Sequence, residues 1–150
     1  MPKQIEATQA HYQSAYFIVR WILGILFLMA GYWKVFVLGS SQHAQQFFVA
    51  GYADYWIPQW LLSVLGTVIQ FWELAAGLLL LIAYRMREVL ISLGVLLMIT
   101  TYGHALQEPL FDITGHTLSR LTLIIFLLLM FRHKDRLGID GWLEYKQIDP

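Results

Sequence analysis

Residues 20–34 read RWILGILFLMAGYWK, an apolar run with a basic residue at each end. Arg20, Gly24, Phe27, Gly31 and Lys34 follow at intervals of four, three, four and three residues, and therefore share one helical face. Both charges thus lie on the face that carries the glycines, where a neighbouring helix can approach closely. The stretch predicts a membrane-spanning helix whose polar face is turned towards the inside of a bundle.

Two further apolar segments repeat this arrangement. In residues 63–77, SVLGTVIQFWELAAG, one helical face holds Ser63, Gly66, Gln70, Glu73 and Gly77. In the third segment, one face holds Gly94, Leu97, Thr101 and His104. Because three segments gather small and polar residues on one side, we expect the helices to pack through these faces. The helix-packing glycines are predicted to be Gly24, Gly31, Gly66 and Gly77.

The composition places the chain in a membrane. Hydrophobic residues make up 58% of its 150 residues and charged residues 13%, whereas a soluble domain carries about 25% charged residues. This excludes a disordered protein and a coiled coil, and the formal net charge of zero excludes a nucleic-acid binder. The absence of cysteine excludes disulfides, thiolate metal sites and iron–sulfur clusters within the chain.

Four segments are candidates to cross the bilayer, whose core needs about 20 helical residues. They cover residues 14–38, 60–82, 89–107 and 113–131. The first half of the last segment is polar, so it should face the bundle or a wet cavity. The expected fold is all-α: a four-helix transmembrane bundle over residues 14–131, with a polar arm at 1–13 and a tail at 132–150.

Basic residues predict the orientation of the bundle. The connection after the second span holds Arg85 and Arg87, and the tail holds four more basic residues, whereas connections 39–59 and 108–113 hold none. Because basic loops stay on the cytoplasmic side, both termini are expected in the cytoplasm. In the outer connection, Ser41 is expected to cap a short helix that ends at Ala50.

Arg20 and Glu73 are predicted to form a buried ion pair. With a rise of about 1.5 Å per residue, Arg20 lies about 9 Å from the inner end of its span and Glu73 about 14 Å from the inner end of its own. A lone charge at such a depth costs about 3 kcal/mol, so pairing is expected. Two roles remain open for the pair. It either fixes the register of the two helices or takes a direct part in chemistry or proton transfer.

The ligand-binding candidates are Lys34, Gln70, His104, His116 and Arg120. The spans are expected to bury three cations, Arg20, Lys34 and Arg120, but only one acid, Glu73. If the histidines are neutral, this leaves a surplus of two positive charges. Loop carboxylates, lipid phosphate, or an anionic or carbonyl-rich ligand would balance that surplus. The alternative is that Lys34 and Arg120 reach out to the lipid headgroups.

No metal site is expected. The suitable side chains are His104, Glu108, Asp112 and His116, but their spacing matches no known metal signature. His11 and His43 fall outside the predicted spans and are expected to be solvated.

The first two spans resemble the DoxX-like family. The resemblance rests on RWILG at 20–24, Phe27-Leu28, AGYWK at 30–34 and ELAAGLLL at 73–80. It implies a small four-helix protein of the bacterial inner membrane, with some relatives that are subunits of thiosulfate:quinone oxidoreductases and others linked to oxidative-stress complexes. The matching residues are Arg20, Gly24, Gly31, Lys34, Glu73 and Gly77.

Three functions are compatible with these features. The first is a quinone-linked redox accessory, in which Lys34, His104 and Arg120 bind a quinone head or small anion while a partner carries electrons. The second is a non-catalytic subunit that associates with a larger membrane complex or with itself. The third is a small transporter, which would have to be a dimer because four spans form a thin bundle. The residues leave open whether the chain is an enzyme.

Overall fold

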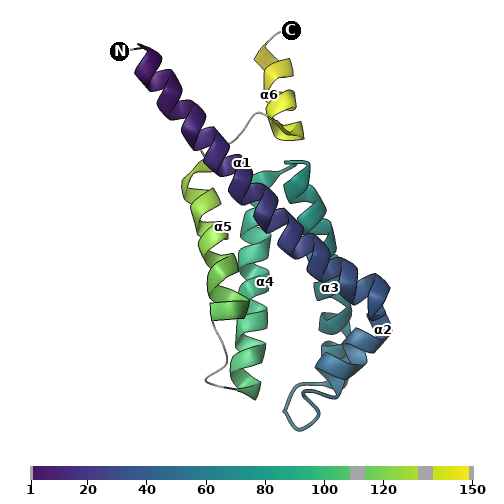
Figure 1. Cartoon of the computed structure of the whole chain (residues 1–150). Coiled ribbons are helices and arrows are strands. Elements are labelled where there is room, and N and C mark those ends of the chain that lie inside the picture. The colour runs from purple at the N-terminus through teal and green to yellow at the C-terminus, as the bar shows by residue number, and fades with distance from the viewer. Residues whose placement is uncertain (1, 109–113, 132–136, 149–150) are drawn as a thin grey trace.

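The computed structural model describes the backbone of residues 2–108, 114–131 and 137–148. Outside turns this part of the chain is helical and contains no strand (Figure 1). The elements are α1 (Pro2–Tyr32), η1 (Trp33–Val37), α2 (Ser40–His43), η2 (Ala44–Val49), α3 (Gln59–Leu81), α4 (Met86–Gln107), η3 (Thr114–Leu118), α5 (Ser119–Leu129) and α6 (Ile139–Ile148). The three η elements are π-helical turns.

Three helical stretches are long and apolar enough to cross a membrane. They are Thr8–Val37, Gln59–Leu81 and Met86–Gln107, and α5 is a shorter apolar helix that η3 extends at its start. The fourth crossing and the cytoplasmic location of the termini stay predictions. α1 begins at Pro2, within the segment that the sequence assigned to a polar arm.

α1 and α3 pack against each other in antiparallel orientation through glycines. A Cβ atom added to Gly24 would lie 2.8 Å from Leu81 Cδ2, and one added to Gly77 would lie 2.7 Å from Leu28 Cα. Gly31 is equally close to the backbone of Leu74. The two helices therefore approach to backbone contact, and Figure 1 shows α1 crossing diagonally over the bundle.

Apolar side chains fill the space between the four long helical elements. Leu23 and Phe27 of α1, Leu80 of α3, Leu93 of α4 and Leu127 of α5 are fully buried. A polar contact also joins α3 to α4, because Trp72 Nε1 donates a hydrogen bond to Ser92 Oγ at 3.2 Å. These apolar residues form the core of the bundle, and the buried polar residues of α1 and α3 lie among them.

The connection between α3 and α4 is held by the C-terminal helix. α3 ends in a left-handed residue, Ala83, with φ at 50°. Gly138 packs directly on the Cβ of Ala83, and the backbone N–H groups of Ile139 and Asp140 donate to the carbonyls of Ile82 and Ala83 at 3.0 Å each. α6 therefore begins against this connection, and Figure 1 shows it at the same end of the bundle as the start of α1.

Asp140 caps the first turn of α4 from outside that helix. Its carboxylate accepts hydrogen bonds from the backbone N–H groups of Arg85 at 2.9 Å and Met86 at 3.0 Å, which have no partner within α4. Asp140→Ala is expected to lower the free energy of unfolding by about 1 kcal/mol, the usual value of a helix cap. Unfolding by SDS in mixed micelles measures this loss, and Asp54→Ala at an exposed loop position is the control. Equal stability of the two variants would contradict the cap.

Candidate ligand-binding site

A π-helical turn directly after the C-terminal end of α1 positions Lys34. The helix widens over Trp33–Val37, where the N–H of Leu38 donates to the carbonyl of Trp33 at 2.9 Å. Lys34 Nζ lies 2.5 Å from Glu73 Oε2, and the Glu73 side chain is only 4% exposed. π-helical turns inside membrane helices often occur at functional sites. Lys34 and Glu73 therefore form an ion pair at the end of the bundle where this π-helical turn lies.

This pairing corrects the ion pair that was expected between Arg20 and Glu73. Arg20 is fully buried, and its Nη1 donates to the carbonyls of Leu80 and Leu81 at 2.7 Å each, at the C-terminal end of α3. Leu80 lies seven residues after Glu73, which separates them by about 10 Å along the helix. Arg20 thus binds carbonyls of the last turn of α3, where the helix dipole favours a cation, and the Leu80 carbonyl also accepts from the N–H of Ala83 at 3.2 Å.

A cavity of about 560 Å³ opens beside the Lys34–Glu73 pair. It lies between η1, η2, α3, the C-terminal half of α4 and the start of α5, at the end of the bundle opposite α6 (Figure 1). Its aromatic lining consists of Trp33, Phe47, Phe48, Tyr52, Trp56 and Tyr102. Its polar lining includes Lys34, His43, Glu73, His104, Thr117 and Arg120.

The structure thus places three of the five ligand-binding candidates around one cavity, namely Lys34, His104 and Arg120. Gln70 is fully buried and does not line the cavity. The side chain of His116 is outside the described part of the chain. The guanidinium carbon of Arg120 lies 5.4 Å from the centroid of the Phe27 ring. Within the described residues, this cation–π contact is the polar interaction that the structure records for Arg120. Its N–H donors are therefore available to a ligand.

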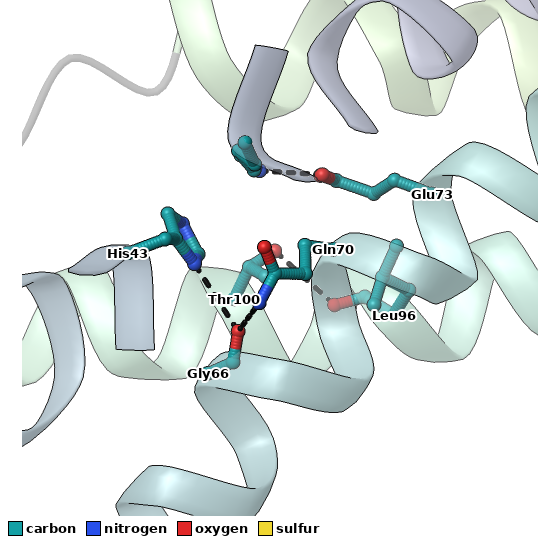
Figure 2. A network of polar contacts seen from close by, with 7 residues as sticks. His43, Gly66, Gln70, Glu73, Leu96 and Thr100 are labelled. Atoms are coloured by element: carbon teal, nitrogen blue, oxygen red, sulfur yellow. Dashed lines mark hydrogen bonds and ion pairs between the residues drawn. The ribbon is translucent and has the colours of Figure 1, made fainter. Parts of the chain in front are cut away.

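His43 is the site residue that the sequence interpretation missed. It was expected to be solvated, but its side chain is 5% exposed and its Nδ1 lies 3.1 Å from the carbonyl oxygen of Gly66 (Figure 2). The segment that carries it starts after Gly39, with φ at 93°, and not with a Ser41 cap. Ala44 then packs on Gly66, where an added Cβ would lie 2.8 Å from Ala44 Cα. The small residue at position 66 was the available signal for this close approach.

Burial lowers the pKa of His43 below its usual 6.5, and the charge of Lys34 acts in the same direction. The hydrogen bond to Gly66 and the charge of Glu73 oppose this shift but do not reverse it. The neutral ring is therefore the form that the folded protein favours.

Acidification is expected to destabilise the protein through His43. Because its folded pKa lies below 6.5, the stabilisation is complete above that pH and is lost as the pH falls through the folded pKa. SDS unfolding at about pH 7.5 and at about pH 5 measures the change, which His43→Phe should reduce. His11→Phe, at an exposed position of α1, is the control and should keep the wild-type pH dependence. If His43→Phe and the wild type lose the same stability on acidification, other groups are responsible.

Comparison with known proteins identifies the family. A family model described as methylamine utilisation protein MauE matches residues 12–108, more than half of the chain. No curated protein and no solved structure matches this chain. The match corrects the resemblance to the DoxX-like family, whose short motifs at 20–34 and 73–80 reflect glycines at a close helix crossing and charges that need partners. With its apolar helices, this is a multi-pass membrane protein. The chain belongs to the MauE family.

Proposed function

We propose that this protein is an accessory subunit of a membrane redox complex and that its outer cavity binds a quinone head group. The observation that carries the proposal is the cavity, which combines apolar and aromatic walls with a few polar groups. Small-molecule sites typically have this composition and volumes of about 300–1,000 Å³. Trp33 and Tyr102 offer flat surfaces for a ring, and the cations offer donors for its oxygens.

The charges around the cavity support a head group that is rich in oxygen. Glu73 balances Lys34, and the buried Arg20 is held by carbonyls at the other end of α3. Among the described lining residues this leaves Arg120 as a cation without a carboxylate partner. A guanidinium has five N–H donors and no acceptor, so it favours a carbonyl oxygen or an anion.

The family description supports a link to redox chemistry. Methylamine is a reduced carbon compound, so its utilisation releases electrons that need an acceptor. In this proposal the chain supplies binding and electrostatics, and a partner protein in the same membrane carries the electrons. The membrane is the bacterial inner membrane, with both termini in the cytoplasm.

Protein purified from native membranes is expected to retain quinone, which lipid extraction and mass spectrometry would detect. Arg120→Gln should lower the retained quinone about tenfold, because one charge-assisted hydrogen bond contributes about 1.5 kcal/mol or more. His104→Ala removes a second polar group of the cavity and should also lower it. Arg87→Gln, at an exposed position of α4, is the matched control and should retain the wild-type amount.

A different result would favour a subunit without a ligand. In that case wild type, Arg120→Gln and Arg87→Gln would contain equally little quinone, although each protein folds and co-purifies with its partner. Melting temperatures in detergent show whether a variant that has lost its quinone is still folded.

A further inference from the structure

The cavity beside the Lys34–Glu73 pair is charged at one end and apolar at the other. At the charged end Lys34 pairs with Glu73, and Arg120 reaches the same space from α5. The apolar end lies between the start of α3 and the end of α4. Its lining residues form what we call the α3–α4 mouth: Leu61, Leu65, Ile99, Tyr102 and Leu106. A ligand that fills the whole cavity must therefore itself be polar at one end and apolar at the other.

The mouth begins beyond the point where α3 and α4 touch. Trp72 Nε1 donates to Ser92 Oγ at 3.2 Å, so these two residues mark the facing sides of the helices. Leu65 precedes Trp72 by seven residues, and residues seven apart lie on the same side of a helix. Ile99 follows Ser92 by the same interval, and both Leu65 and Ile99 line the cavity. The cavity therefore extends between the facing sides of α3 and α4, towards the end of the bundle where α3 starts and α4 ends.

The mouth reaches the lipid-facing surface of the bundle. Ile99 is 37% exposed and Tyr102 57% exposed, although both line the cavity. Both α3 and α4 are long and apolar enough to cross a membrane. Ile99 lies eight residues before Gln107, the last residue of α4, which is about 12 Å along the helix. Because the hydrocarbon core is about 30 Å thick, the mouth opens into lipid.

The connection after η2 covers the cavity at the end of the helices. Gln107 Nε2 donates to the carbonyl of Gly51 at 2.9 Å, and the hydroxyl of Tyr55 donates to the carbonyl of Leu106 at 2.9 Å. η2 itself packs on α3, so residues 44–55 bridge α3 and α4 across this end. A chain attached to a bound ring therefore leaves sideways, between the two helices.

We infer that the ligand is a lipid-dissolved quinone whose apolar chain leaves the protein through the α3–α4 mouth; this inference rests on the proposed function. The ring lies at the charged end, where Lys34 and Arg120 donate to its oxygens. Glu73 follows Leu65 by eight residues, about 12 Å along α3, which is longer than a single ring. The first units of an isoprenoid chain cover this distance, and the rest of the chain stays in the bilayer. The protein thus takes its ligand from the membrane.

Photolabelling of the wild-type protein locates the chain. The probe is a decylubiquinone analogue with a diazirine on the first carbons of its chain, added to the full-length protein in lipid nanodiscs. After irradiation, mass spectrometry is expected to find the label on the mouth residues of α3 and α4. Excess decylubiquinone should remove this label, which separates bound probe from probe that reacts out of the lipid. Label that is competed away but lies on η1 or α5 overturns the exit between α3 and α4.

Ile99→Trp is expected to obstruct the mouth. Affinity capture of the nanodiscs, followed by extraction, measures the binding of decylubiquinone and of ubiquinone-0, which has the same ring and no chain. The variant should lower the affinity for decylubiquinone about tenfold relative to that for ubiquinone-0, because the added ring occupies the path of the chain. Met98→Trp is the matched control, since the neighbouring Met98 is 73% exposed and does not line the cavity, and it should keep the wild-type ratio. An unchanged ratio in Ile99→Trp contradicts the inferred path.

The outcomes separate this inference from the proposed function. Wild-type protein that binds both quinones, with no label at the mouth, keeps the proposed function and loses the chain exit. Wild-type protein that binds neither quinone overturns both. If Ile99→Trp does not fold, the labelling of the wild type still decides where the chain leaves.

Discussion

Glu73→Gln is expected to lower the free energy of unfolding by about 3 kcal/mol. Removing one partner of a buried ion pair leaves the other charge without compensation, and such changes cost about 3–5 kcal/mol. The Lys34 side chain is 23% exposed, which places the expected loss at the lower end of that range. SDS unfolding in mixed micelles measures it. Glu108→Gln, at the exposed end of α4, is the control and should have little effect.

A double-mutant cycle attributes this loss to Lys34. Lys34→Met alone strands Glu73, which is 4% exposed, and should also be strongly destabilising. The double variant Lys34→Met/Glu73→Gln removes both charges, so it should be more stable than the sum of the two single losses predicts. Arg20→Met combined with Glu73→Gln should instead give additive losses, because Arg20 contacts the carbonyls of Leu80 and Leu81. Equal melting temperatures for Glu73→Gln and Glu108→Gln would refute the pair.

The sequence located the polar faces of the first two spans but not the register between them. The expectation of an Arg20–Glu73 pair relied on a depth for Arg20 that was counted from a span starting at residue 14. The helix α1 instead starts at Pro2. The observed contacts of Gly31 with Leu74 and of Gly24 with Leu81 align the helices so that Arg20 reaches the end of α3. The depth of a residue within its own helix is therefore not enough to predict its ion-pair partner, because the crossing of two helices decides which charges meet.

The cavity beside Lys34 and Glu73 could be predicted only in part. Lys34, His104 and Arg120 were identified because a membrane penalises polar groups in apolar segments. That rule says nothing about residues 39–58, whose composition permits a solvated loop. His43 is buried because Ala44 can settle against Gly66, a tertiary contact between segments far apart in the chain. A single sequence does not show such a contact, although the small residues that permit it are visible.

Gly77→Ala is expected to destabilise the protein by about 3 kcal/mol, the upper end of the usual cost of overpacking. The added Cβ would meet the backbone nitrogen and the Cα of Leu28, the latter at 2.7 Å, and the carbonyl oxygen of Gly24 at 2.9 Å. These are backbone atoms of α1, so no rotation of a side chain relieves the overlap and the two helices must separate. Separation along this crossing would also pull Lys34 from Glu73 and widen the cavity beside them, so quinone retention should fall together with stability.

Gly94→Ala is the matched control for this effect. An added Cβ at Gly94 would meet nothing within 4 Å, and alanine favours a helix over glycine by about 1 kcal/mol. This variant is therefore expected to be as stable as the wild type or slightly more stable in the same SDS titration, with unchanged quinone content. If both alanine variants unfold like the wild type, α1 and α3 do not touch at Gly77, and the antiparallel crossing that places Lys34 beside Glu73 must be different. A loss confined to Gly77→Ala shows that the cavity depends on this crossing, because the same chemical change on α4 leaves the α1–α3 contact untouched.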